Sequence, residues 1–290
     1  MRPRHLPERA LWVDGAIVRG EQATISLFDR GARDGEGIFE TLRIYGRHPF
    51  QWRRHLERLV LAAAELGFPV PPSPARLREA LDTLLDAEAL RDAVVRITVT
   101  RGVAGGRPTK TGCWVEIEPL AARLWGGTSS GRASAIFSRR AFEPGSLGRY
   151  KTTSRLAYHL AREEARAARV DEALLVSGAG EVLEGAVSNL FVVQDGVVST
   201  PPLARGILPG LTRAAVIAAC ADLRLPCREA TLDRSTLAGV DEVFLTNSVQ
   251  QVVPLATLAG RPLPARTIGD RLGAAYRTMV ERAVGGGDEA

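Results

Sequence analysis

Lysine is scarce in this chain. It occurs only at Lys110 and Lys151, and arginine supplies the rest of the 38 basic residues. A lysine amine can form an imine with a carbonyl compound, whereas a guanidinium stays protonated and cannot replace it in that role. A mechanism that requires a lysine therefore has two candidate positions.

Cysteine and histidine are also few, and neither shows the spacing of a structural site. The cysteines form no CxxC pair and are odd in number, which argues against a disulfide framework and a zinc site. The histidines lack metal-ligand spacing and single out no Ser-His-Asp arrangement. These residues are Cys113, Cys220, Cys227, His5, His48, His55 and His159. We expect no bound metal and a reducing, cytoplasmic location.

Long apolar runs are missing as well. The basic N-terminus is followed by no apolar core of signal-peptide length, and no uncharged run approaches the length of a membrane helix. The net charge of +5 comes from arginines that are spread through the chain without interleaved aromatic residues. We therefore expect neither a membrane nor a nucleic-acid partner. A positive field instead favours small anionic substrates and a phosphate-bearing cofactor.

The length of 290 residues is enough for two modest domains, each with its own core. A glycine- and serine-rich stretch near the middle of the chain breaks both helical and strand periodicity. We predict a small N-terminal domain over residues 1–122, a linker over 123–131 and a larger domain over 132–290.

Turn residues and periodicity predict the elements of both domains. In the first domain we expect hairpins over 11–18 and 39–50, amphipathic helices over 56–63 and 76–90, and strands over 94–100 and 113–117. In the second we expect hairpins that turn at 178–180 and 195–196, a helix after Pro209 and a strand over 242–246. Tight hairpins indicate antiparallel pairing, so the predicted fold class is α+β.

Lys151 stands just ahead of a predicted helix whose apolar residues include Leu156 and Leu160. Thr153 or Ser154 is the expected N-cap. The positive end of the helix dipole disfavours a cation there and lowers the pKa of an amine, as imine formation requires. The alternative is an ordinary solvated lysine. Lys110 follows a glycine-rich stretch, but Thr109 stands where a phosphate loop needs glycine, so we interpret that segment as a loop.

Three other segments contain side chains suited to binding or catalysis, but their positions in the sequence alone do not decide their roles. Glu184 ends a predicted strand and is either a turn residue or a partner for a protonated ring nitrogen. The run from Leu208 to Thr212 opens a helix with glycine and a hydroxyl residue, which suits a phosphate. The run from Thr246 to Ser248 adds small hydroxyl and amide donors after a strand.

Taken together, these segments resemble the fold-type IV family of enzymes that depend on pyridoxal 5′-phosphate (PLP), a family of class IV aminotransferases. Nearly the whole chain takes part, in order. The segments are Phe28-Asp29-Arg30-Gly31, Gly35-Glu36-Gly37-Ile38-Phe39-Glu40, His55-Leu56-Glu57-Arg58-Leu59, Lys151, Glu184, Ser188-Asn189-Leu190-Phe191, Gly206-Ile207-Leu208-Pro209-Gly210-Leu211-Thr212-Arg213 and Thr246-Asn247-Ser248. Each segment is weak alone, but the ordered set is specific.

The resemblance implies a small α/β N-terminal domain, a larger hairpin-rich α/β C-terminal domain, and a homodimer with active sites at the domain interface. It implies that Lys151 is the Schiff-base lysine and moves the substrate proton, and that Glu184 holds the pyridinium. It also implies a phosphate site, with residues Arg58, Leu211, Thr212, Asn247 and Ser248.

Departures from the family's patterns bear on the substrate. Phe39-Glu40-Thr41 differs from the Phe-Glu-Gly run of branched-chain enzymes, and the loop around Arg107 lacks the Arg-x-His pair of well-known D-amino-acid aminotransferases. We expect Phe39 and Arg107 to line the substrate site, and Arg33 and Arg96 to replace the missing carboxylate clamp. Arg96 stands inside an apolar strand without an obvious local partner, where an arginine is costly unless an anion meets it. The alternative is that Arg96 forms a structural ion pair.

The expected function is transamination between a D-amino acid and a 2-oxo acid such as 2-oxoglutarate. The alternative is a pyruvate-releasing aminodeoxychorismate lyase, because Thr246-Asn247-Ser248 resembles that branch. A branched-chain aminotransferase and a non-catalytic PLP-binding protein are less favoured.

Overall fold

The structure is a computed structural model that describes residues 9–103, 112–126 and 132–286. The chain forms two compact units. The first contains the residues up to Arg123, the segment Tyr150–Ser154 and the end of the chain from Ala283; the second contains Leu124–Arg149 and Arg155–Arg282. The limits of 1–122 and 132–290 stay a prediction, and residues 127–131 of the expected linker lie outside the described residues.

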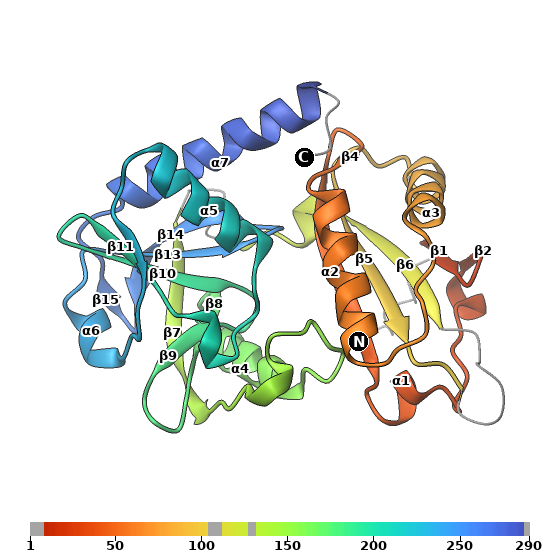
Figure 1. Ribbon diagram of the computed structural model, residues 1–290, viewed down its shortest axis with the longest axis horizontal. Coiled ribbons are helices and arrows are strands. Elements are labelled where there is room, and N and C mark those ends of the chain that lie inside the picture. The colour runs from red at the N-terminus through yellow and green to blue at the C-terminus, as the bar shows by residue number, and fades with distance from the viewer. Residues whose placement is uncertain (1–8, 104–111, 127–131, 287–290) are drawn as a thin grey trace. The chain divides into compact units, whose positions relative to one another are not determined.

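The first unit is built on a six-stranded sheet with the order β2-β1-β6-β5-β3-β4 (Figure 1). All its neighbouring strands are antiparallel. The strands are β1 (Ala10–Val13), β2 (Ala16–Arg19), β3 (Gly37–Tyr45), β4 (His48–Pro49), β5 (Ala93–Thr100) and β6 (Cys113–Pro119). Both expected hairpins are present. Their turns use the left-handed conformation, at Asp14-Gly15 and at Gly46-Arg47.

Two helices, α2 (Trp52–Glu65) and α3 (Pro74–Ala87), pack against this sheet (Figure 1). Side chains alternate along β3, so Ile38, Leu42 and Ile44 enter the core that these helices cover. Val60, which we expected on the apolar face of α2, is 44% exposed because the buried face runs through the neighbouring positions Leu56, Leu59 and Ala63. The unit's short helical turns are η1 (Gly20–Gln22), α1 (Arg30–Arg33) and η2 (Leu120–Ala122).

The segment Tyr150–Ser154 packs on the first unit because its backbone extends the start of β3. The Phe39 amide donates to the Lys151 carbonyl at 2.8 Å, and the Thr153 amide donates to the Gly37 carbonyl at 2.8 Å. The following helix, α4 (Leu156–Ala167), begins with Arg155 at its N-cap and has no side-chain cap. The expected cap by Thr153 or Ser154 is therefore wrong, since both hydroxyls donate to the carbonyl of Gly35 instead, at 2.9 Å each.

The second unit is built on a nine-stranded sheet within the described residues, with the order β12-β11-β10-β13-β14-β7-β8-β9 and β15 beside β14. The strands are β7 (Ala133–Ala141), β8 (Glu172–Val176), β9 (Val182–Gly185), β10 (Asn189–Gln194), β11 (Val197–Thr200), β12 (Cys227–Glu229), β13 (Glu242–Asn247), β14 (Gln251–Leu258) and β15 (Arg261–Pro262). The hairpins β8-β9 and β10-β11 match the predicted turns. Three pairs (β11-β12, β14-β7 and β7-β8) are parallel, so the sheet is mixed rather than antiparallel throughout.

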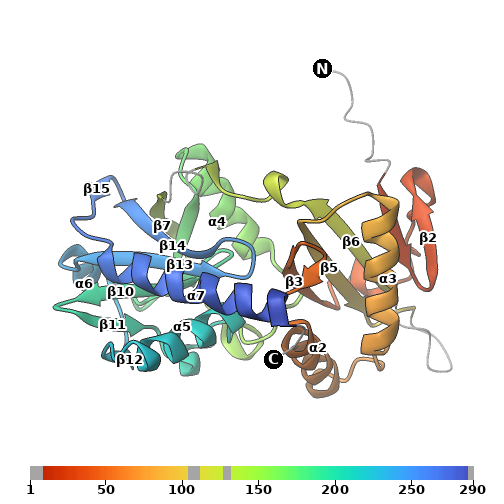
Figure 2. The ribbon, with the colours of Figure 1, turned by 90° about the horizontal axis from the view of Figure 1, so that it is seen from above.

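Helices cover this sheet: α4, α5 (Leu211–Asp222), α6 (Arg234–Ala238) and α7 (Thr267–Gly286), with the short turns η4 (Gly145–Leu147) and η5 (Leu203–Arg205). Helix α7 runs beside β13 and β14, where Gly269 approaches the Phe244 ring (Figure 2). Phe244 stacks on Phe191 of β10, with centroids 4.9 Å apart. These contacts fix the strand ends that carry Asn189 and Asn247.

A charged cluster is buried beneath the helices of the first unit. Glu40 of β3 is 1% exposed and accepts bonds from Arg58 Nε (2.7 Å, at Oε1) and Nη2 (2.8 Å, at Oε2), while His55 Nδ1 lies 2.7 Å from Oε2. Burial would raise the pKa of Glu40, but the charge of Arg58 and the hydrogen bonds from Arg58 and His55 outweigh burial and hold it well below its usual range. Burial lowers the pKa of His55, and Glu40 offsets this only in part.

A neutral, buried His55 should make stability depend on pH. Below the ordinary histidine pKa of about 6.5, His55 binds a proton in the unfolded chain but not in the folded chain. The free energy of unfolding therefore falls as the pH drops. The His55→Asn variant keeps an N–H donor for Glu40 but cannot titrate. Its free energy of unfolding should fall less than that of wild type between pH 7.5 and 5.5, by at most about 1.4 kcal/mol, as measured by denaturant titration.

The control is His48→Asn, which removes an exposed imidazole and should keep the pH dependence of wild type. If the His55→Asn variant shows the same pH dependence as wild type, His55 binds its proton equally well in the folded and the unfolded chain, and the assignment of a lowered pKa is wrong.

Candidate functional site

Two cations meet one aromatic ring on the first unit. The Lys151 Nζ atom lies 4.6 Å from the centroid of the Phe39 ring, and the Arg96 guanidinium carbon lies 3.7 Å from the same centroid. Arg96 reaches the ring because β5 pairs with β3 so that Arg96 stands opposite Thr41, diagonal to Phe39. Cation–π contacts hold both groups there. Two positive charges around a 5% exposed ring attract an anion.

Arg96 forms the structural ion pair that is the alternative to a carboxylate clamp. Its Nε atom lies 3.6 Å from Glu116 Oε1 on the neighbouring strand β6, and 3.3 Å from the hydroxyl of Thr98. The pair forms because strand register places Glu116 directly opposite Arg96. Burial raises the pKa of Glu116, and Arg96 offsets only part of that rise. A long, half-exposed ion pair contributes little to stability. Another carboxylate can therefore replace Glu116 as the partner of Arg96 at a small cost in free energy.

Of the other expected substrate residues, the structure describes Arg33. Arg33 ends the one-turn helix α1, which Asp29 caps by accepting from the Gly31 amide at 2.7 Å, and its side chain is exposed. A joint clamp of Arg33 and Arg96 stays a prediction. Arg107 and Lys110 lie outside the described residues.

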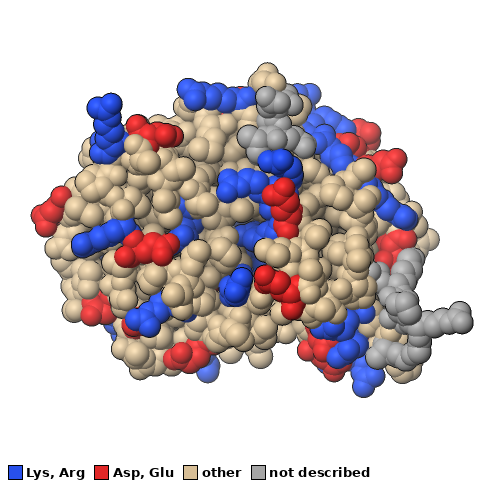
Figure 3. Space-filling view, in the orientation of Figure 1, with Lys and Arg blue, Asp and Glu red and all other residues tan. Residues whose placement is uncertain are grey.

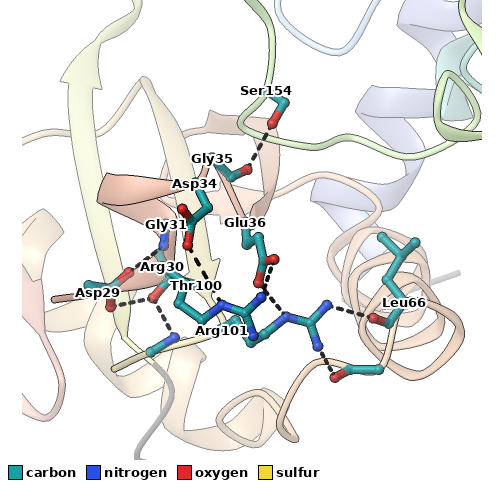
Figure 4. A network of polar contacts seen from close by, with 12 residues as sticks. Asp29, Arg30, Gly31, Asp34, Gly35, Glu36, Leu66, Thr100, Arg101 and Ser154 are labelled. Carbon is teal, nitrogen blue, oxygen red and sulfur yellow. Dashed lines mark hydrogen bonds and ion pairs between the residues drawn. The ribbon is translucent and has the colours of Figure 1, made fainter. Parts of the chain in front are cut away.

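A polar network fixes the start of β3 against the end of β5 (Figure 4). Glu36 stands between two arginines, with Arg30 Nη2 at 2.5 Å and Arg101 Nε at 2.7 Å, the latter an ion pair without hydrogen-bond alignment. Arg101 also donates to the carbonyls of Leu66 and Gly67 at the end of α2. The network thereby ties β3 and β5 to the helix that carries His55 and Arg58.

Two glycines, Gly35 ahead of β3 and Gly37 at its first position, make room for the lysine segment. A Cβ atom on Gly35, which has φ +71°, would lie 2.6 Å from the Ser154 hydroxyl; a Cβ on Gly37 would lie 2.6 Å from the Thr153 hydroxyl. Figure 4 shows the bond between Ser154 and Gly35. The Gly-Glu-Gly run of the sequence therefore serves to seat the segment that carries Lys151.

Glu184 is held from several sides within the second unit. It is 3% exposed at the end of β9, and its Oε2 atom accepts from the Asn189 amide (3.2 Å) and the Leu208 amide (3.1 Å). The Tyr158 hydroxyl lies 3.5 Å from Oε1. Burial, and then the charge of Glu184, raise the pKa of Tyr158, so it remains a neutral phenol.

Tyr158 did not figure in the sequence-based site. It lies on the first turns of α4, with the Arg155 guanidinium 3.6 Å from its ring centroid and Phe142 edge-on at 4.7 Å. A tyrosine two turns after the candidate lysine was visible in the sequence, but nothing local showed that it would lie against Glu184. Its contact comes from the packing of α4 on β8 and β9.

The expected phosphate-binding segments have donors to offer. Helix α5 begins after Gly210 without a side-chain cap, so its first amides have no partner from that residue. Asn247 accepts from the amides of Val249 (2.9 Å) and Gln250 (2.7 Å) and so shapes the turn that carries Ser248. Thr246, 1% exposed and opposite Asn189, has a buried hydroxyl without a hydrogen-bond partner.

An uncapped helix start, an orphaned hydroxyl and a buried carboxylate form the donor set that a phosphorylated pyridine requires. The phosphate suits the amides and hydroxyl, and a protonated ring nitrogen suits the carboxylate. The residues of this unit therefore fit PLP. Thr246 stands in the same run of donors as Asn247 and Ser248 but was not among the predicted phosphate-site residues, because only the strand pairing shows that its hydroxyl is buried.

Other classes of site find little support in residues 9–103, 112–126 and 132–286. Over these ranges no cluster of three metal-ligating side chains occurs. No helix in the described parts of the chain combines the length and apolar character that a bilayer crossing needs. On the face drawn in Figure 3, basic side chains are interspersed with acidic ones.

Comparison with known proteins gives a consistent result. Residues 37–258 match the family model for amino-transferase class IV. The chain is 31% identical to a putative branched-chain-amino-acid aminotransferase of Methanocaldococcus jannaschii, over 90% of this chain and 91% of the relative. It is 29% identical to a D-alanine aminotransferase of Bacillus licheniformis, over 86% and 88% of the two chains.

The fold is also that of solved aminotransferases. The T.th. branched-chain amino acid aminotransferase complexed with N-(5′-phosphopyridoxyl)-L-glutamate superimposes with a TM-score of 0.83 at 29% identity, over 95% of each chain. The expected α+β fold of type IV, the PLP cofactor and an aminotransferase are thereby confirmed. With more than half of its length matched by the family model, this chain belongs to the class IV aminotransferases.

Proposed function

We propose that this enzyme transfers an amino group between a D-amino acid and a 2-oxo acid such as 2-oxoglutarate. The observation that carries the proposal is the pair of cations on Phe39: Arg96 at 3.7 Å and Lys151 at 4.6 Å. A transaminase must hold a carboxylate close to a reactive amine in both half-reactions, and a planar guanidinium does this with two parallel hydrogen bonds. Arg96 is the group on this surface that can do so.

When bound, PLP supplies the electron sink for bond breaking at the α-carbon. In this proposal Lys151 bonds the cofactor and moves the substrate proton, and Glu184 keeps the ring nitrogen protonated. Arg58 binds the phosphate, and its two bonds to Glu40 orient its guanidinium beforehand. Lys151 lies close enough to His55 to lower the pKa of that histidine, which supports a common site for Arg58 and the lysine.

The remaining cofactor contacts come from the second unit. Residues proposed to complete the phosphate site are Leu211, Thr212, Asn247 and Ser248, to which the buried hydroxyl of Thr246 is added. The dimeric state and the cytoplasmic location stay predictions.

Two features support a D-amino acid with a dicarboxylic acceptor. Thr41 stands where the Phe-Glu-Gly run of branched-chain enzymes has glycine. Because Thr41 lies opposite Arg96, this difference from the branched-chain enzymes is next to the proposed carboxylate site. Arg96 faces Glu116, a side-chain carboxylate that resembles the distal group of glutamate. D-Alanine aminotransferases are also among the relatives, at 28–29% identity.

The second candidate is a branched-chain aminotransferase acting on L-amino acids. Relatives of that name reach 31% identity, and solved structures of that name reach a TM-score of 0.83. A substrate panel separates the candidates: turnover of D-alanine or D-glutamate with 2-oxoglutarate supports the proposal, whereas turnover confined to L-valine, L-leucine and L-isoleucine supports the second. Pyruvate release from aminodeoxychorismate without an oxo-acid acceptor would indicate the lyase.

Replacement of Lys151 tests the cofactor assignment. Lys151→Ala should abolish the visible absorbance of lysine-bonded PLP and lower kcat by roughly a hundred- to ten-thousandfold, because no other amine can both bond the cofactor and move the proton. Absorbance spectra and peptide mapping after borohydride reduction measure this. Lys110→Ala is the matched control and should keep both properties. Borohydride labelling of Lys110 in wild type would contradict the assignment.

Replacement of Arg96 tests substrate recognition. Arg96→Gln should raise KM for 2-oxoglutarate about ten- to a hundredfold, the loss expected for a charged hydrogen bond, with little change in bound PLP. Steady-state kinetics with D- and L-glutamate measure the effect. The control is Arg76→Gln, which removes an arginine of α3 that contacts the Trp12 ring and should leave KM unchanged. An unchanged KM in the Arg96 variant would assign the substrate carboxylate to another group.

A further inference from the structure

The buried amide of Asn189 joins two parts of the proposed cofactor site in the second unit. Its Nδ2 atom donates to Glu184 Oε2 at 3.2 Å and to the Leu208 carbonyl at 2.9 Å. The Leu208 amide donates to the same Glu184 oxygen at 3.1 Å. Because both surrounding acceptors face the amide nitrogen, this orientation of the Asn189 side chain is the only one that satisfies them.

The other end of the amide shapes the start of helix α5. A Cβ atom on Gly210 would lie 2.0 Å from Asn189 Oδ1, so residue 210 must be glycine for the chain to pass over this oxygen. Gly210 is the N-cap of α5, the residue before Leu211 and Thr212. One 4% exposed side chain therefore sets the distance between the carboxylate of Glu184 and the first amides of α5.

The turn that precedes Asn189 is fixed separately. Glu172 of β8, 1% exposed, accepts from the Val187 amide (3.1 Å) and the Ser188 hydroxyl (2.8 Å). A Cβ on Gly185 would lie 2.7 Å from the Glu172 carboxylate. Since the turn 185–188 is anchored in this way, the position of the Asn189 backbone does not depend on its side chain. Loss of the side-chain amide should therefore free Glu184 and residues 208–210 without undoing β10.

We propose that Asn189 is a positioning residue that couples the carboxylate for the ring nitrogen to the phosphate-binding start of α5. The inference rests on the proposed function, in which Glu184 and α5 contact the same cofactor. Asparagine suits this role because it has two N–H donors and one acceptor. Leucine has its shape but no donors, and aspartate places a second carboxylate beside Glu184.

The test compares holoenzymes that carry Asn189→Leu, Asn189→Asp, Glu184→Gln and the double change N189L/E184Q. The control is Thr200→Val, which removes another buried hydrogen bond of the same sheet, from the Thr200 hydroxyl to the Leu190 carbonyl at 2.7 Å. Three quantities are measured: kcat, the rate at which PLP is lost during dialysis, and Tm without PLP. The first two report positioning, and the third reports general stability.

If Asn189 couples the two parts, N189L and N189D should lose PLP about ten- to a hundredfold faster than T200V at comparable Tm, and kcat should fall by a similar factor. The kcat of the double variant should lie close to that of E184Q, because the effect of Asn189 on catalysis passes through Glu184. PLP retention and kcat equal to those of T200V, or losses that multiply independently in the double variant, would overturn the inference. Normal turnover of E184Q would instead refute the proposed role of Glu184 in catalysis. In that case the rate of PLP loss still tests Asn189, because N189L that retains PLP as well as T200V does would overturn the inference.

Discussion

The backbone pairing of the lysine segment with β3 is the constraint on which the first unit's site depends. Two backbone hydrogen bonds, from the Phe39 amide to the Lys151 carbonyl and from the Thr153 amide to the Gly37 carbonyl, fix the position of Lys151 along the strand. That position places its amine against the Phe39 ring, and strand register brings Arg96 to the same ring. A shift of one residue would turn Phe39 to the helical face of the sheet and separate the ring from both cations.

This pairing also means that the two faces of β3 carry different groups. The odd-numbered Phe39 presents its ring to the cations, whereas the neighbouring Glu40 points into the helical face and holds Arg58. An ionised Glu40 keeps Arg58 in one orientation, and burial excludes the water that would weaken the pair. The proposed phosphate contact of Arg58 and the proposed carboxylate contact of Arg96 thus depend on opposite faces of one strand.

Local sequence patterns were sufficient for many of the elements and for naming the candidate site residues. The turns at Asp14-Gly15 and Asp195-Gly196 and the periodicity of α2 are readable over a few residues, and the scarcity of lysine makes Lys151 one of two candidate amines. The partners of these residues were not readable. Glu116 opposite Arg96, Tyr158 beside Glu184 and the orphaned hydroxyl of Thr246 all arise from strand register or helix packing, which bring together residues far apart in the chain. The cap expected at Thr153 failed for the same reason, since its hydroxyl bonds Gly35.

The two proposed halves of the cofactor site differ in how much substitution they tolerate. Around Glu184 the contacts pass through backbone amides, and glycine is required at 185 and 210, where a Cβ atom would collide with a buried polar atom. Around Phe39 the contacts are made by half-exposed side chains in a part-solvated ion pair, Arg96 with Glu116, whose replacement costs little stability. Substitutions should therefore accumulate on the Phe39 side while the surroundings of Glu184 stay constant. Chains about 30% identical to this one carry the names of enzymes for branched-chain substrates and for D-alanine, and we expect the differences that matter for substrate choice to lie on the Phe39 side.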